Sequence, residues 1–143
     1  MSVSSSVGMR GSSKRLGAWA LQGVVAAAFF AAGSAKLAGA SSMIQMFNQI
    51  GVGQWFRIVT GLVEIFGAIA LLYPGIAAIG GLWLGFTMVG AVVTHLFVLH
   101  SSPAAPAVLL ALNALIVYLR RDQLITLATT VQSGHLHTRR NEG

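Results

Sequence analysis

The sequence predicts an all-α protein, a four-helix transmembrane bundle with both termini in the cytoplasm. The first observation is composition: the 143 residues are 55% hydrophobic and only 8% charged, whereas soluble domains are about 25% charged. The second is that four apolar stretches approach or reach the length of about 20 residues that a helix needs to cross the hydrocarbon core. The third is that basic residues gather at the ends of these stretches.

The placement of charge predicts the partner and the topology. The net charge is +6, but the basic residues flank apolar stretches, which suits a lipid bilayer and not a nucleic acid. Seven Lys and Arg residues lie on the side of the two termini, and only Lys36 and Arg57 lie on the other side. The positive-inside rule therefore predicts a multi-pass protein of the cell (inner) membrane with cytoplasmic termini.

Three regions are expected along the chain. Residues 1–15 are small, polar and basic, and predict a disordered cytoplasmic N-terminus. Residues 16–120 form the membrane domain, and residues 121–143 form a basic cytoplasmic tail. The first span covers about residues 16–35. A cleavable signal peptide is the alternative for this span, because a basic segment precedes it and small residues end it. Its length and the spans that follow favour a transmembrane helix.

Residues 40–56 interrupt the apolar pattern and predict a short helix on the membrane surface, with a loop as the alternative. Met43, Phe47 and Ile50 would share one helical face. A serine at position 41 or 42 would cap the start of such a helix. Glycines at 51 and 53 would end it.

Three further spans are expected at about residues 57–73, 76–99 and 104–119. Pro74-Gly75 is a tight-turn sequence, so the second and third spans should be antiparallel neighbours. The fourth span is the shortest and suits a thin or locally adapted bilayer. Pro106 falls in its first turn, where the missing N–H does little harm.

Glu64 lies inside the second span, where a charge is most costly. The chain has only three acidic residues. The helical face of Glu64 is small and weakly polar, being formed by Thr60, Gly61, Gly67 and Ala68. Small residues let transmembrane helices approach closely, so this face should point into the bundle. Intramembrane acids mark functional sites by default, and a purely structural lock between helices is the alternative.

Five polar residues are candidates for ligand binding or proton transfer in the outer half of the membrane: Lys36, Arg57, Glu64, His95 and Asn113. Helix geometry places Glu64 roughly 10 Å inside the second span. Because the tight turn makes spans two and three neighbours, Glu64 and His95 should approach each other. No catalytic residue is assigned and no metal site is predicted.

Each candidate also has a structural alternative. Glu64, His95 and Asn113 would then be interhelical hydrogen-bonding groups. Lys36 would extend its ammonium toward the headgroups, and Arg57 would contact a lipid phosphate. The chain has no cysteine, which excludes disulfides, cysteine-ligated zinc, iron–sulfur clusters and a thiol–disulfide relay.

Three segments of the chain resemble signature segments of the DoxX-like membrane protein family in order and spacing. They are FFAAGSAKLAG (29–39), GLVEIFGAIALL (61–72) and MVGAVVTHL (88–96). The resemblance covers about residues 15–120 and implies a four-helix membrane bundle. Lys36, Glu64 and His95 match the recurring polar positions of the family, which offers no settled catalytic role. The resemblance also implies a link to redox chemistry, since some members are subunits of thiosulfate:quinone oxidoreductase or associate with respiratory proteins.

These observations favour a quinone-interacting or redox-complex-associated subunit with a polar pocket in the outer half of the bilayer. Redox or respiratory proteins are then the expected partners, and quinone is the candidate cofactor. The alternatives are a non-catalytic membrane scaffold and a small-molecule binder or carrier. Transport would require a homo-oligomer, because four helices leave little room for alternating access.

Overall fold

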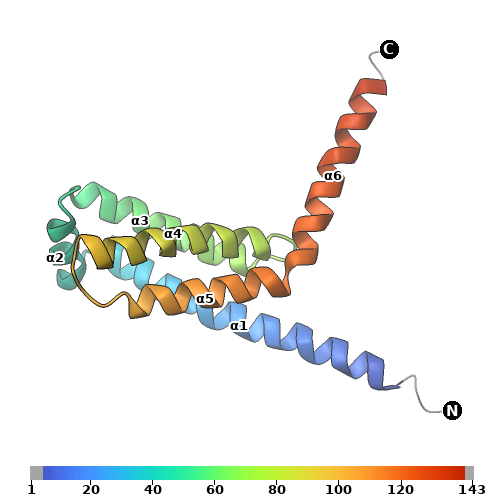
Figure 1. The fold of residues 1–143 in the computed structure, drawn as a ribbon, viewed down its shortest axis with the longest axis horizontal. Helices are drawn as coiled ribbons and strands as arrows, with labels where there is room; N and C mark the ends of the chain where they lie inside the picture. The colour runs from blue at the N-terminus through green and yellow to red at the C-terminus, as the bar shows by residue number, and fades with distance from the viewer. Residues whose placement is uncertain (1–4, 141–143) are drawn as a thin grey trace.

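The computed structural model of the chain describes the backbone of residues 5–140 and the side chains of residues 13–131. All regular secondary structure in the described residues is α-helical (Figure 1). Its six helices are α1 (Ser5–Ala38), α2 (Ser41–Ile50), α3 (Gln54–Leu72), α4 (Ala77–Phe97), α5 (Ala104–Leu119) and α6 (Arg121–Arg140). Three helices are long and apolar enough to cross a membrane, and α5 together with the first part of α6 makes a fourth, bent candidate.

Four of the helices, α1, α3, α4 and α5, pack along one another. Helix α2 and the α4–α5 connection lie at one end of these four helices, which we call the α2 end (Figure 1). The start of α1 and all of α6 leave from the opposite end, which we call the α6 end. The start of α1 and the end of α6 therefore lie beyond the same end of the packed helices (Figure 1).

The N-terminal region differs from the expectation of disorder. Helix α1 begins at Ser5, so the described part of residues 1–15 is helical; residues 1–4 lie outside the described residues. Adding turns to an existing helix requires no new nucleation, so the membrane helix can extend through a segment that lacks proline. The expected basic tail is likewise helical, as α6, from Arg121 to Arg140.

Helix α2 confirms the short helix at residues 41–50 and excludes the loop alternative. The expected serine cap is wrong: Ala40 is the N-cap residue, without a side-chain hydrogen bond. The glycine stop is confirmed, since Gly51 has φ of 79° and donates its N–H to the carbonyl oxygen of Phe47. Phe47 is buried and its ring packs edge-on against Phe56, with centroids 5.9 Å apart. This contact fastens α2 to the start of α3.

The core lies between the four packed helices. Its buried members come from every one of them: Val25, Ala26 and Phe29 of α1, Ala68 and Leu71 of α3, Leu84 and Met88 of α4, and Ile116 of α5. Glycines bring the backbones close together. A Cβ on Gly67 would lie 2.5 Å from Leu84, and one on Gly80 would lie 2.7 Å from the backbone nitrogen of Leu71. Small residues at helix contacts are the usual means of close packing in lipid.

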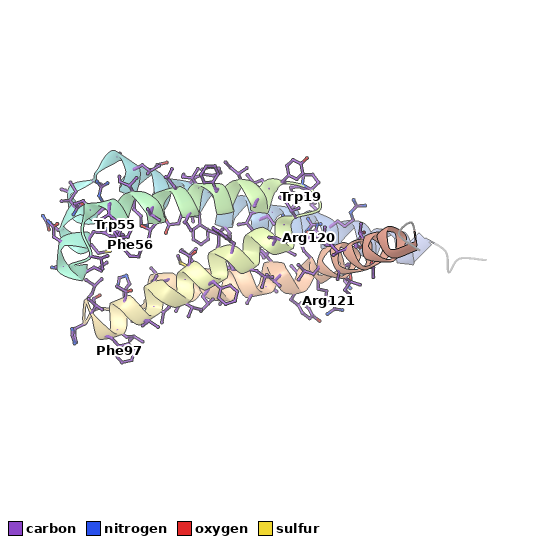
Figure 2. The ribbon with its side chains drawn as sticks, turned by 90° about the horizontal axis from the view of Figure 1, so that it is seen from above. Trp19, Trp55, Phe56, Phe97, Arg120 and Arg121 are labelled. Carbon is purple, nitrogen blue, oxygen red and sulfur yellow. The ribbon has the colours of Figure 1, made fainter. Side chains whose placement is uncertain are left out.

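Aromatic residues mark both ends of the packed helices (Figure 2). Trp55, Phe56 and Phe97 lie at the α2 end, and Trp19 lies with Arg120 and Arg121 at the α6 end. Between the two ends, large apolar side chains such as Phe66 and Phe86 are exposed by 63% and 76%. Aromatic belts flanking an exposed apolar surface are typical of membrane proteins, so the surface as well as the helix lengths indicates a multi-pass membrane protein.

Candidate polar site within the membrane

Lys36 and Glu64 form a buried ion pair between α1 and α3. The Lys36 ammonium donates to both carboxylate oxygens of Glu64, at 3.0 Å to Oε1 and 2.8 Å to Oε2. The two side chains are only 13% and 5% exposed. The partner of Glu64 is therefore Lys36, and not His95 as the sequence analysis expected.

The direction of the two helices explains this pairing. Side chains on a helix lean toward its N-terminus, and α1 and α3 run in opposite directions (Figure 1). Lys36, in the last turn of α1, therefore leans into the helix pair, while Glu64 leans toward the α2 end to meet it. The snorkelling alternative for Lys36 is wrong, because the ammonium points to the carboxylate and is largely buried.

Two glycines bring α1 and α3 together beside the ion pair. A Cβ on Gly33 would lie 2.9 Å from the carbonyl oxygen of Gly61, and a Cβ on Gly61 would lie 3.1 Å from that of Gly33. Real Cβ atoms are essentially never found as close as 2.9 Å, so Gly33 requires glycine. The 3.1 Å at Gly61 is tighter than most real Cβ contacts, so a side chain there would push its neighbours aside. The short distance between the helices lets the two long side chains meet without bridging a gap.

The predicted interior face of α3 is confirmed. Gly61, Glu64, Gly67 and Ala68 are all buried. Thr60 is half-buried, and its hydroxyl bonds to backbone carbonyls of its own helix. This face serves two neighbours, because Gly61 contacts α1 whereas Gly67 contacts α4.

Arg57 lies in the first turns of α3 and is bound on one side only. Its Nε donates to Oε1 of Gln54 at 2.7 Å, but its Nη1 is buried without a hydrogen-bond acceptor. Gln54 in turn donates to Asn48 at 2.7 Å and so links this group to α2. Lys36 and Glu64 form the one ion pair found among the side chains of residues 13–131. No carboxylate in that range therefore neutralises the Arg57 guanidinium.

His95 lies at the end of α4, away from the expected pairing with Glu64. Its Nδ1 is 2.8 Å from the Ser101 hydroxyl, and the Ser101 N–H donates to the His95 carbonyl oxygen at 2.9 Å. His95 therefore braces the α4–α5 connection. The tight turn did make α3 and α4 neighbours, but the partner of Glu64 comes from α1.

Asn113 is fully buried on α5 and faces α4. Its side-chain nitrogen donates to the carbonyl oxygen of Leu109, one turn back in the same helix, at 2.8 Å. Its Oδ1 has no hydrogen-bond donor. A Cβ on Gly85 would lie 3.9 Å from the Cβ of Asn113. The hydrogen bond of the Asn113 side chain thus lies within α5 and does not join two helices, contrary to the expected interhelical bond.

A second polar cluster, which the sequence analysis missed, lies at the α6 end. Gln22 of α1 is 1% exposed. Its amide nitrogen donates to the backbone carbonyl of Leu71. Its Oε1 accepts two bonds from the Arg120 guanidinium, at 2.9 Å from Nε and 2.6 Å from Nη2. The same guanidinium lies 5.2 Å from the centre of the Trp19 ring. We call this group the Gln22–Arg120 clamp.

A local signal for the clamp was present in the sequence. Gln22 is a long polar side chain inside the first apolar run, where an unpaired amide is costly. Its partner could not be found locally, because Arg120 lies 98 residues away. In the sequence Arg120 indicated only which side of the membrane it faces. Among the described residues, no group of three or more His, Cys, Asp or Glu side chains is placed to hold a metal ion.

Comparison with known proteins identifies the middle of the chain. The family model of the DoxX-like family matches residues 20–117. That segment is more than half of the chain and includes the Lys36–Glu64 pair, Arg57, His95 and Asn113. Arg120 and α6 lie outside it. Neither the curated proteins nor the solved structures gave a match.

Proposed function

This chain belongs to the DoxX-like family, and on that premise we propose that it is a quinone-interacting subunit of a membrane redox complex. We propose further that it is a four-helix transmembrane bundle of the cell membrane with both termini in the cytoplasm. Family membership and apolar helices make it a multi-pass membrane protein. The side-by-side packing of α1, α3, α4 and α5 supports the count of four spans.

The observation that carries the quinone proposal is the unsatisfied donor on Arg57. A buried N–H without an acceptor is costly, and more so on a charged group. A quinone carbonyl oxygen is an acceptor that can come from the surrounding lipid. Arg57 and Glu64 are seven residues apart on one face of α3, about 10 Å along the helix. A head group held by Arg57 would thus lie near the Lys36–Glu64 pair.

The ion pair adds groups that can hold a proton. Reduction of a quinone takes up two electrons and two protons. Lys36 and Glu64 share hydrogen bonds at 2.8 and 3.0 Å, so a proton can pass between these two groups, and the pair can supply a proton to a quinone oxygen that comes within hydrogen-bond reach of it. The electrons would come from a partner subunit, which is why a redox or respiratory complex is the proposed setting.

The test is the quinone content of the protein purified from membranes in mild detergent. We expect wild-type protein to carry quinone and Arg57→Gln to lose at least most of it. Arg121→Gln is the matched control, because it removes an arginine at the α6 end (Figure 2). Equal quinone content in wild type and Arg57→Gln would overturn the proposal. Mass spectrometry of copurifying proteins would identify the partner subunit.

A non-catalytic scaffold is the second candidate, and a specific observation favours it. Both Glu64 oxygens are already occupied by Lys36, and the pair lies beside the close Gly33–Gly61 contact of α1 and α3. A scaffold needs only that the two helices stay together. Lys36→Met/Glu64→Leu replaces the pair with apolar groups of similar volume. A scaffold would retain its partner proteins in this variant, whereas a quinone site would lose its proton-transfer groups and its activity.

The proposed topology has its own test. Reporter fusions at Ser13, Gly53, Ser102 and Gly143 should report cytoplasm, outside, outside and cytoplasm. This order follows from the seven basic residues on the side of the termini against two on the other. A cytoplasmic signal at Gly53 together with an external signal at Gly143 would reverse the orientation.

A further inference from the structure

We propose that α6 is an interfacial helix that docks on a bilayer surface of anionic phospholipid, at the membrane face where it emerges. The proposal goes beyond the quinone site, because it uses none of the residues at the α2 end. It concerns the segment beyond residue 117, which the DoxX-like family model does not match.

The direction of α6 is the first observation. Helices α5 and α6 are bent by 58° at Arg120. In Figure 1, α6 turns away from the four packed helices at their end and does not continue along them. A helix that leaves the bundle at this angle is directed away from the bilayer normal.

The bend is held from both sides. Arg120, at the bend, is bound by Gln22 and covered by Trp19 in the Gln22–Arg120 clamp. Gln123, in the first turn of α6, accepts the backbone N–H of Ala78 at 3.1 Å. That N–H belongs to the first turn of α4 and has no partner within its own helix. These contacts set the angle at which α6 starts.

The bend also lies at the level of the lipid headgroups. Tyr118 is 62% exposed at the end of α5, and the Arg121 guanidinium lies 4.7 Å from the centre of its ring. Trp19, on α1, lies at the same end (Figure 2). Tyrosine and tryptophan are enriched where the hydrocarbon core meets the headgroups. Helix α6 therefore begins at the surface of the bilayer.

The described part of α6 has an apolar face with helical spacing. The face consists of Leu124, Leu127, Ala128 and Val131. Leu124 is half-buried where α6 meets the bundle, whereas Leu127 and Val131 are exposed by 37% and 63%. Thr126 and Thr130 lie on the other side. The apolar face thus continues outward from the bundle with nothing in the described chain covering it, as in helices that lie in the membrane interface.

The charge at this end selects the kind of lipid. Lys14, Arg15 and Arg121 are exposed there, and the sequence adds Arg139 and Arg140 to the same helix as Arg121. Asp122 is the acidic residue of the first turn of α6. Basic residues beside an apolar face favour anionic headgroups, and the attraction acts within a Debye length of the surface. A neutral bilayer would accept the apolar face but would not engage these cations.

The absence of cysteine from the chain allows a single-cysteine test with the full-length protein. We would place a polarity-sensitive fluorophore at Val131, through Val131→Cys, and at Thr130, through Thr130→Cys, as the matched position on the other face. Each protein would be reconstituted in nanodiscs of phosphatidylcholine alone and of an equal mixture of phosphatidylcholine and phosphatidylglycerol. Emission and quenching by a water-soluble quencher would be measured.

We expect the label at position 131 to be blue-shifted and protected in the anionic nanodiscs, with the label at 130 accessible in both. Protection at 131 should fall in the neutral nanodiscs and at high salt, because salt screens exposed charges. Equal access at both positions would place α6 in water and overturn the proposal. Equal protection at both, as in a continued span, would also overturn it. If protection at 131 were the same in neutral and anionic nanodiscs and at low and high salt, the proposed role of anionic lipid would be overturned. The apolar face would then be assigned to a neutral bilayer or a protein partner.

Discussion

The Lys36–Glu64 pair and the Gln22–Arg120 clamp hold a cation at opposite ends of the four packed helices, with different chemistry. At the α2 end, the ammonium of Lys36 is neutralised by a carboxylate from another helix. At the α6 end, the guanidinium of Arg120 has a neutral amide oxygen and an aromatic face as partners. A cation in a membrane protein thus needs compensation, but the compensation need not be an opposite charge.

Depth accounts for the difference. Glu64 lies about 10 Å inside α3 when counted from Arg57, where a charge without a partner is most costly. Arg120 is half-buried beside Trp19 at the α6 end (Figure 2). Dipoles and a π-face suffice there. Arg57 combines features of both cases, because it is buried at Nη1 and bound only by Gln54. For this reason it is the residue to which we assign a ligand.

The largest effect should come from breaking the charge pair. Lys36→Met leaves the Glu64 carboxylate buried without its partner, so we expect a loss of about 3 kcal/mol in the free energy of unfolding. Reversible unfolding in mixed detergent micelles would measure it. Lys36→Met/Glu64→Gln is the control, since it removes both charges and should recover most of the loss. If Lys36→Met were as stable as wild type, the pair would not be buried as described.

Breaking the Gln22–Arg120 clamp should cost slightly less unfolding free energy than breaking the charge pair. Gln22→Leu leaves two Arg120 donors and the Leu71 carbonyl without their partner, and bonds to charged groups contribute about 1.5–3 kcal/mol. We expect a loss of about 2 kcal/mol in the same unfolding assay. Gln22→Glu keeps the acceptor for Arg120 and should cost less than Gln22→Leu. If Gln22→Leu cost more than Lys36→Met, the order of the two sites would be reversed.

The helix contact beside the charge pair should respond to a single methyl group. In Gly33→Ala the new Cβ would lie 2.9 Å from the Gly61 carbonyl oxygen, so α1 and α3 must separate, at a cost of about 1–2 kcal/mol. Gly23→Ala lies on the same helix, with nothing within 4 Å of its new Cβ, and should be neutral or slightly stabilising. Thermal stability in detergent would compare them. Equal melting temperatures for the two variants would contradict the close contact.

The smallest effect should come from the aromatic part of the clamp. Trp19→Leu removes the ring that faces Arg120 at 5.2 Å but leaves both hydrogen bonds to Gln22. Cation–π contacts at partly exposed sites contribute about 0.5–1 kcal/mol, and we expect a loss in that range. Trp83→Leu, at a tryptophan that is 54% exposed on α4, is the control. An effect no greater than the control would show that Gln22 holds Arg120 without help from the ring.

The sequence by itself determined the helices and their interior faces. Hydropathy and residue spacing are local properties, so the bounds of α5 were predicted to the residue and those of α3 and α4 to within a few residues. The same spacing put Glu64, Gly61 and Gly67 on the buried face of α3. The turn at Pro74-Gly75 made α3 and α4 neighbours. Local signals were weaker at the two ends: α1 extends through a segment expected to be disordered, and α6 lies in a tail for which no helix was predicted.

Only the tertiary structure decided which polar groups meet. Lys36, Arg57 and His95 were all within reach of Glu64 by depth. The antiparallel direction of α1 and α3, with the Gly33–Gly61 contact, chose Lys36. His95 instead forms a hydrogen bond with Ser101, in the α4–α5 connection. Gln22 met Arg120 across 98 residues of chain. Depth depends on position along one helix, whereas pairing depends on how two helices face each other, and that relation is absent from any single segment.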